Sequence, residues 1–283
     1  MMKKMFATML ALSMCLSLAA CGPKSSASTS GSSAGTSASS ASGSQTAASD
    51  VDYVKEKGTL IVGMTDFAPM DYKEEGSDEW IGFDADMAKA FAESLGVEVE
   101  FLEINWDNKV LELENKGTDA VWNGMTLTDD VKALMATSEP YCLNGQVVVL
   151  SADVADQYQT AESLSGLSFA VENGSAGMEQ AEAAGLDYVA MDTQAKALME
   201  VASGTSDAAI IDLLMAVAMV GEGTSYPDLT YTVQLSSDEY GVGFRKGSDL
   251  AEAFSSFWKE AYEAGTVMET AEKYGIQDVM IEK

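Results

Sequence analysis

Three short segments carry polar groups where a parallel strand is expected to end. Asn123-Gly124-Met125-Thr126 follows an expected strand over 119–122 and offers main-chain groups, a carboxamide and a hydroxyl. Gly174-Ser175-Ala176 opens an expected helix, whose unpaired backbone N–H groups attract an anion without a cationic side chain. Asp212 closes another expected strand and supplies a carboxylate. Because ligands of α/β sheets bind at the carboxyl ends of the strands, we expect these groups to form a binding site.

The composition excludes several kinds of catalysis. The chain has no histidine, which removes Ser-His-Asp and Cys-His catalysis and the commonest metal ligand. Arg245 is the single arginine, and no paired-carboxylate spacing can be read from the chain. We therefore expect neither a metal nor a cofactor.

The first 21 residues have the pattern of an export signal. Lys3 and Lys4 precede an apolar run over 5–18 that is too short to remain as a membrane span. The sequence Leu18-Ala19-Ala20-Cys21 resembles the lipobox of bacterial lipoproteins. This resemblance implies a signal peptide over 1–20, acylation of Cys21 and anchoring on the outer face of the cell membrane. An ordinary signal peptide with a chance cysteine is the alternative.

A flexible tether is expected over 21–50, because residues 25–49 are only Ser, Ala, Thr, Gly and Gln.

Loss of the signal leaves 14 basic and 45 acidic residues, a formal charge of −31, which repels nucleic acid and anionic lipid. Cys142 would then be the single unmodified cysteine, so no internal disulfide can form. We interpret it as a small buried apolar residue rather than a reactive thiol.

The folded body alternates strands and helices twice. The first set has strands at 59–63, 97–101 and 119–122, a helix capped by Asp84 and stopped by Gly96, and a helix over 107–115. The second set has strands at 146–150, 168–171, 188–191, 207–211 and 229–235 and a helix over 193–201. An apolar segment at 240–244 and amphipathic helices follow, the latter with Phe254, Trp258, Tyr262 and Val267 toward the core. Two α/β lobes are predicted.

The order of several motifs resembles one family across residues 58–274. These motifs are Gly63-Met64-Thr65-Asp66-Phe67-Ala68-Pro69-Met70, the segment 81–90 (IGFDADMAKA), the segment 119–128 (DAVWNGMTLT), Pro140-Tyr141, Gly174-Ser175-Ala176 and the segment 240–247 (YGVGFRKG). Together they resemble the extracytoplasmic solute-binding proteins of polar amino acid ABC transporters, bacterial solute-binding protein family 3.

The resemblance implies a type II periplasmic-binding-protein-like fold, with two lobes, two hinge crossover strands and a ligand cleft that closes on binding. The first lobe would take residues 51–148 and 236–283, and the second 149–235. The implied partners are a small-molecule ligand and an ABC permease, and the protein is expected to act as a monomer.

The resemblance also assigns roles to individual residues. Phe67 and Trp106 would form an aromatic pair around the ligand, with core packing as the alternative for each. Asp212 would take the ligand's ammonium, with a helix N-cap as its alternative role. The full set of expected ligand-binding residues is Phe67, Trp106, Asn123, Gly124, Met125, Thr126, Ser175, Ala176 and Asp212, with Asp66 and Gly174 as possible additions.

One position departs from the family pattern. Val131 stands where the family has an arginine that holds the ligand carboxylate with two bonds, three residues beyond Thr128, which is expected to cap a helix. The neighbouring Lys132 would point away and lacks the fork. Either the helix end at Ser175 binds the ligand carboxylate, or the ligand has no free α-carboxylate there. In the second case amines, modified amino acids and short peptides are candidate ligands.

The leading function is a lipid-anchored receptor that delivers an amino acid or related amine-bearing molecule to a permease, and not an enzyme. A sensor that docks on a membrane receptor is one alternative. A dehydratase on the same fold, with acidic residues such as Asp66 and Asp212 as acid and base, is another. The sequence does not distinguish a permease from a sensor or identify the ligand.

Overall fold

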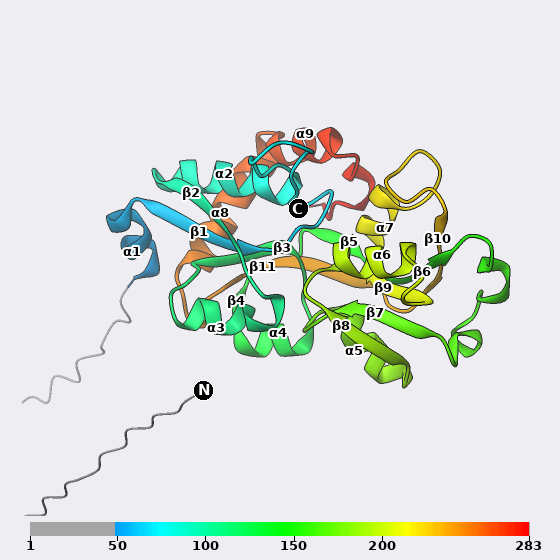
Figure 1. The fold of residues 1–283 in the computed structure, drawn as a ribbon. Coiled ribbons are helices and arrows are strands. Elements are labelled where there is room, and N and C mark those ends of the chain that lie inside the picture. Colours follow the sequence, from blue (N-terminus) through cyan, green and yellow to red (C-terminus); the bar gives the residue numbers. More distant parts are fainter. Residues whose placement is uncertain (1–48, 283) are drawn as a thin grey trace, which may run out of the picture. The chain divides into compact units, whose positions relative to one another are not determined.

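The computed structural model describes residues 49–282, whose fold is drawn in Figure 1. The predicted signal peptide, Cys21 and the tether up to residue 48 lie outside the described residues. Helix α1 (Asp50–Lys57) begins after Ser49, whose Oγ accepts a 3.0 Å hydrogen bond from the backbone N–H of Asp52. Within residues 49–282, no helix combines the length and apolarity needed to cross a membrane.

The first sheet is built around a buried central strand. Its order is β2 (Glu98–Glu103), β1 (Thr59–Met64), β3 (Ala120–Thr126), β11 (Asp238–Phe244) and β4 (Ala136–Thr137), with β5 (Cys142–Asn144) also paired to β11. Strand β1 runs parallel to β2 and β3, whereas β11 is antiparallel to β3, β4 and β5. Residues 120–125 of β3 are all buried, since helices cover both faces.

Helices of this first lobe, the part built on the first sheet, hold an aromatic core. They are α1, α2 (Phe83–Leu95), α3 (Lys109–Glu114), α4 (Asp129–Leu134), α8 (Leu250–Glu263) and α9 (Thr266–Lys273), with the short 3-10 helices η1 (Trp106–Asn108) and η4 (Gln277–Val279). The Phe254 ring packs edge-on against Trp122, 5.0 Å between centroids, and against Phe91 at 5.5 Å. Phe254, Trp258 and Val267 are buried as predicted, whereas Tyr262 is only partly buried.

The expected cap of α2 is wrong. Gly82 occupies the N-cap position, and Asp84 lies inside the first turn of the helix. Its buried carboxylate instead accepts hydrogen bonds from the Gly124 backbone N–H at 2.6 Å and from the Tyr141 hydroxyl at 2.8 Å. Gly96 does end the helix, in the left-handed conformation that glycine tolerates.

The second lobe is built on a five-stranded sheet. Its order is β10 (Leu229–Gln234), β6 (Gln146–Ser151), β9 (Ala208–Asp212), β7 (Ser168–Glu172) and β8 (Asp187–Met191), with helices α5 (Ala176–Ala184), α6 (Gln194–Ala202) and α7 (Leu213–Met219) and 3-10 helices η2 (Ala155–Gln157) and η3 (Ala161–Leu164). Strands β7, β8 and β9 are parallel, and β6 is antiparallel to β9 and β10.

The chain passes between the two sheets twice. It leaves the first sheet after β5 and enters the second at β6, and it returns between β10 and β11. Gly145 alone separates β5 from β6, and a Cβ there would lie 2.5 Å from the Ser236 carbonyl oxygen of the returning segment. The two crossings therefore pack side by side.

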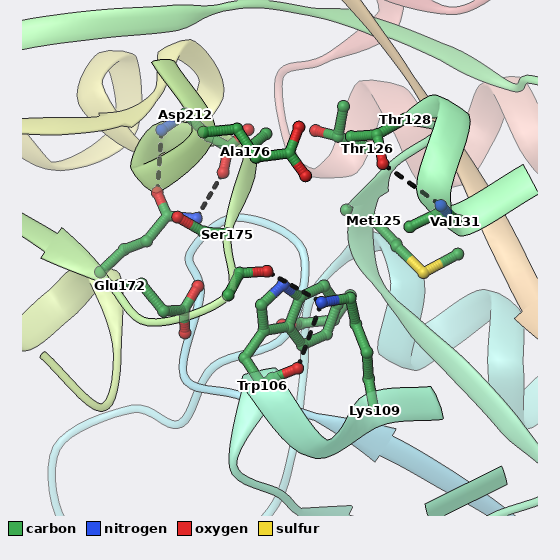
Figure 2. Close-up of a pocket in the computed structure, with 15 residues that line it drawn as sticks. Trp106, Lys109, Met125, Thr126, Thr128, Val131, Glu172, Ser175, Ala176 and Asp212 are labelled. Atoms are coloured by element: carbon green, nitrogen blue, oxygen red, sulfur yellow. Dashed lines mark hydrogen bonds between the residues drawn. The ribbon is translucent and has the colours of Figure 1, made fainter. Parts of the chain in front are cut away.

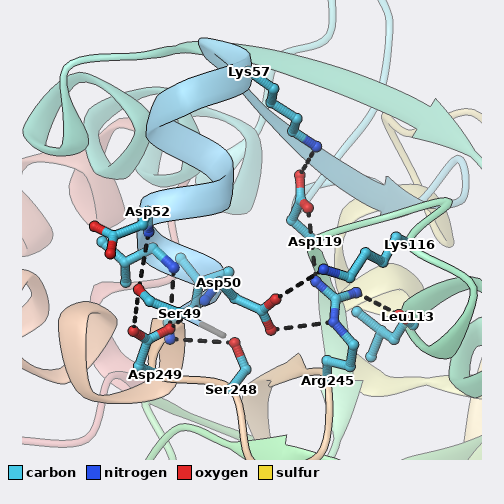
Figure 3. Close-up of polar contacts among 12 residues, drawn as sticks. Ser49, Asp50, Asp52, Lys57, Leu113, Lys116, Asp119, Arg245, Ser248 and Asp249 are labelled. Carbon is cyan, nitrogen blue, oxygen red and sulfur yellow. Dashed lines mark hydrogen bonds and ion pairs between the residues drawn. The ribbon is translucent and has the colours of Figure 1, made fainter. Parts of the chain in front are cut away.

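The single arginine is a structural residue of the first lobe. Arg245 Nε donates a 3.1 Å hydrogen bond to Asp50 Oδ2, and its Nη1 donates to the main-chain oxygens of Leu113 and Thr118. The backbone N–H of Asp50 also donates to Asp249 Oδ1 at 2.8 Å (Figure 3). The beginning of the described chain is thereby fixed to the segment that follows β11.

Candidate ligand-binding site

A small cavity lies between the two lobes. Its walls come from the end of β3, from η1 and from α4 in the first lobe, and from the ends of β7 and β9 and the start of α5 in the second (Figure 2). The fold therefore brings together the ends of β3 and β9, which are separated by almost ninety residues in the sequence. Among residues 49–282, no group of three or more acidic, cysteine or histidine side chains could hold a metal ion.

Most of the expected binding residues line this cavity. They are Trp106, Asn123, Gly124, Met125, Thr126, Gly174, Ser175, Ala176 and Asp212. Phe67 and Asp66 are absent from the cavity wall. Four lining residues with polar side chains were not among those expected, namely Lys109, Glu172, Glu179 and Gln194, and Thr128 and Val131 line the cavity as well.

Asp212 is held by three amide side chains. Oδ1 accepts hydrogen bonds from Asn144 Nδ2 and, at 2.8 Å, from Gln146 Nε2, while Oδ2 accepts one from Gln194 Nε2. The backbone N–H of Asp212 donates to Gln194 Oε1 at 2.8 Å, so this amide fixes both ends of the residue. Asp212 occupies the N-cap position of α7, but its side chain makes no capping hydrogen bond. The carboxylate is therefore positioned by amides rather than by the helix.

The charge of Asp212 depends on two opposing effects. Burial raises the pKa of Asp212 to about 6, and the hydrogen bonds from Gln194 and Gln146 oppose that rise. The pKa stays below neutral pH, so the side chain is mainly ionised there. A buried carboxylate that is ionised and faces a cavity favours a cationic partner.

Phe67 does not stand at the cavity wall. Its ring is 2% exposed and packs edge-on against Tyr240, with 6.2 Å between the centroids. Gly124, at φ +54°, lies over this ring, and a Cβ on Gly124 would come within 2.6 Å of Phe67 Cε1. Because Gly124 has no side chain, the Phe67 ring can pack directly against its backbone. Trp106 is thus the aromatic residue of the expected pair that lines the cavity.

The polar groups of Asn123 and Gly124 are occupied within the first lobe. Asn123 Oδ1 accepts from the Thr65 backbone N–H at 3.0 Å, and its Nδ2 donates to Asp71 Oδ2 at 2.8 Å. The Gly124 N–H donates to Asp84. These contacts shape the end of β3 and leave little hydrogen-bonding capacity for a ligand. The side chain of Thr126 faces the cavity (Figure 2).

Helix α5 begins at Ala176, within the segment expected to open a helix, and Ser175 is its N-cap. Its Oγ accepts a 3.2 Å hydrogen bond from the backbone N–H of Met178. Gly177 in the first turn lets the helix approach β9, since a Cβ there would lie 2.8 Å from the Ile210 carbonyl oxygen. The start of α5 is thereby held at the cavity. Thr128 likewise caps α4 as predicted, by accepting from the Val131 N–H.

The side chain of Lys109, a residue of the first lobe, contacts the second lobe. Its Nζ donates to the Gly174 carbonyl oxygen at 2.8 Å and to the Trp106 carbonyl oxygen at 3.3 Å, and it lies 5.1 Å from the Trp106 ring centroid (Figure 2). Burial lowers the pKa of Lys109, against the effect of nearby Glu172, Asp107 and Glu179. The sequence did contain a signal that Lys109 belongs to the site. It follows Trp106 by three residues and therefore lies on the same face of a helix.

Glu172 is the other buried carboxyl group at the cavity. It ends β7 and is 2% exposed. Burial raises the pKa of Glu172 to about 8, and the Asp212 carboxylate adds to the rise, while Thr65, Lys109 and Gln194 oppose it. The strand predicted from the sequence ended at residue 171, so the burial of Glu172 was missed.

Comparisons with known proteins agree with this architecture. The family model of bacterial extracellular solute-binding proteins, family 3, matches residues 60–277. The L-cystine-binding protein TcyJ of Escherichia coli (strain K12) is 30% identical over 230 residues, covering 80% of this chain and 86% of TcyJ. The arginine-binding extracellular protein ArtP of Bacillus subtilis (strain 168) is 28% identical over 283 residues, covering 96% and 98%. A crystal structure of a mutant of ArgBP from T. maritima superimposes with a TM-score of 0.73 at 34% identity, covering 79% of this chain and 98% of that one. The predicted family and two-lobed fold are confirmed.

Proposed function

Because the chain belongs to the bacterial extracellular solute-binding proteins of family 3, we propose that it captures an amino acid or related amine-bearing molecule for an ABC importer. The ligand enters the cavity between the lobes and is enclosed when they close. The protein acts as a monomer and passes the ligand to a membrane permease.

The observation that carries this proposal is the environment of Asp212. Its ionised carboxylate faces the cavity, and the three amides Asn144, Gln146 and Gln194 fix its orientation. An ammonium group placed there would gain a charge-assisted hydrogen bond in a partly dehydrated site. The Trp106 ring supplies an apolar wall for the rest of the ligand. The relatives named for cystine and arginine binding support an amino acid as the ligand class.

The carboxylate end of an amino acid would lie toward the start of α5. Val131 lines the cavity at the family's arginine position and offers no charge, so the N–H groups around Ser175 and Ala176 and the Thr126 side chain are the remaining candidates. A ligand without a free α-carboxylate fits the same cavity. This is why amines and modified amino acids belong in any ligand search.

We place the protein outside the cytoplasm, held at the cell membrane by a lipid on Cys21. The support is the lipobox-like sequence Leu18-Ala19-Ala20-Cys21, which lies outside the described residues. The Ser- and Ala-rich tether then lets the folded body reach a permease.

A thermal-shift screen with amino acids, polyamines and dipeptides tests the binding proposal. A ligand that binds only the folded protein stabilises it by about 2.7 kcal/mol at one hundred times Kd, and this stabilisation raises the melting temperature. We expect at least one amine-bearing compound to do so. The absence of any shift at millimolar concentrations would contradict the proposal, and turnover of a bound compound would favour the dehydratase alternative.

A further inference from the structure

The carboxyl group of Glu172 has an unused acceptor. Its Oε1 is buried and has no hydrogen-bond partner among the residues that the structure describes. Glu172 itself lines the cavity, at the end of β7 (Figure 2). Buried polar atoms in folded proteins are nearly always paired, so an orphaned carboxyl oxygen at a cavity indicates a missing partner.

Glu172 and Asp212 end neighbouring strands. Strands β7 and β9 are parallel, with Val171 opposite Ile210, so their last residues leave the sheet at the same edge. Both residues line the cavity, and the negative charge of Asp212 raises the pKa of Glu172. Two carboxyl groups so placed are costly together without a cation between or beside them.

The cavity holds fewer cationic than acidic side chains. Lys109 is the one basic residue that lines it within residues 49–282, and its ammonium is engaged by the carbonyl oxygens of Gly174 and Trp106. Glu179 adds a third lining carboxylate. Even with Glu172 protonated, the carboxylates of Asp212 and Glu179 outnumber the Lys109 ammonium, so a ligand with no net charge would leave the closed site negative.

We propose that Glu172 and Asp212 together form a two-carboxylate subsite, and that the ligand is a net-positive amine rather than a neutral amino acid. This inference rests on the proposed function and names the ligand class of the same site. A basic amino acid and a polyamine share the required chemistry, since each brings more cationic nitrogens than carboxylates.

The proposal has a consequence for the pH dependence of binding. The charged groups that act on Glu172 are Asp212 from β9 and Lys109 from the first lobe. Glu179 from α5 lines the same cavity, and Glu179 and Asp107 act in turn on Lys109. With the pKa of Glu172 raised to about 8, the empty site is protonated at neutral pH, and a bound cation must displace that proton. Affinity for a cation should therefore rise from pH 6 to pH 8, by roughly tenfold per pH unit at most.

Calorimetry on the mature chain tests the inference. The probes are L-arginine, L-lysine and putrescine as cationic compounds, and L-glutamine and L-leucine as neutral ones, each at pH 6 and pH 8. Wild-type protein should prefer a cationic probe, and Glu172→Gln should weaken that probe at least tenfold while changing neutral probes less than threefold. The rise in affinity between pH 6 and pH 8 should be lost in this variant.

The control is Glu222→Gln, which removes the same charge from an exposed position of the second lobe that does not line the cavity. It should leave both affinity and pH dependence unchanged. If Glu172→Gln does not fold, wild-type titrations in two buffers of different ionisation enthalpy replace it, and they should report release of up to one proton at pH 7. A release near zero would overturn the inference.

The outcomes separate the two proposals. Tight binding of neutral probes with none of the cationic ones would overturn the subsite and leave the amino acid receptor intact. Equal losses for cationic and neutral probes in Glu172→Gln would also overturn it, because they indicate a structural role. If no probe of either kind binds, both the subsite and the proposed function fail.

Discussion

Lys109 Nζ donates a 2.8 Å hydrogen bond to the carbonyl oxygen of Gly174, and this bond joins the first lobe to a strand end of the second. Beside it the two backbones are in close contact, because a Cβ on Gly174 would lie 2.7 Å from Asp107 Cα. This contact between the lobes leaves no room for a side chain at position 174.

Gly174→Ala should oppose closure. The added methyl group meets Asp107 Cα, a backbone atom that cannot rotate away, and overpacking of this kind costs about 1 to 3 kcal/mol, or roughly 5- to 150-fold in affinity. Small-angle scattering with saturating ligand should give a larger radius of gyration than wild type. Gly204→Ala is the control, since its φ of +76° is similar but nothing lies within 4 Å. Equal effects of both variants would assign the loss to backbone strain.

Asp212→Ala should abolish most of the binding. It removes the charge that faces the ligand and leaves the amides of Asn144, Gln146 and Gln194 without their acceptor, with an expected loss of about 2 to 5 kcal/mol in binding free energy. Calorimetry with the ligand found by thermal shift measures this. Asp187→Ala, at an exposed position of the same lobe, should bind normally. Unchanged affinity in Asp212→Ala would remove its assigned role.

Val131→Arg should strengthen the binding of free α-amino acids. Val131 lines the cavity in the first turns of α4, and a guanidinium there would add a contact worth about 1.5 to 3 kcal/mol to a carboxylate. Val131→Met adds bulk without charge and separates steric effects from electrostatic ones. No gain across a panel of amino acids would mean that the ligand carboxylate lies elsewhere.

Gly124→Ala should destabilise the first lobe. Its φ of +54° disfavours an L side chain, and the new Cβ would lie 2.6 Å from Phe67 and 3.1 Å from Tyr240, so a loss of about 2 to 5 kcal/mol in unfolding free energy is expected. Denaturant unfolding measures the loss. Gly223→Ala also has positive φ, +84°, but open space around it. A similar loss in both would show that ring contact contributes nothing.

Cys21→Ala should release the protein from the membrane or leave its precursor uncleaved. Without the thiol there is no site for the lipid, and fractionation of cells and medium detects the change. Cys15→Ala is a matched control, because this cysteine precedes the expected cleavage site. Normal membrane retention of Cys21→Ala would count against the anchor.

Much of the site could be predicted because strand ends are visible as local patterns. Ser175 and Asp212 follow apolar runs, and both line the cavity. The occupied state of Asn123 could not be predicted, since its partners Thr65 and Asp71 are more than fifty residues away in sequence. Glu172 was missed for a related reason, because a carboxyl group after an apolar run usually marks a solvated turn. Groups from distant parts of the chain, including Thr65 and Lys109 of the first lobe, lie near it in the fold.

The ion pair between Asp50 and Arg245 bears on how an anchored molecule would respond to force. A pull transmitted through the chain that precedes Asp50 would be borne by the body of the first lobe, near the helix that follows β11. Both covalent connections to the second lobe lie elsewhere, after β5 and before β11. If Cys21 carries the proposed lipid, tension on the tether would thus act first on the lobe that does not swing.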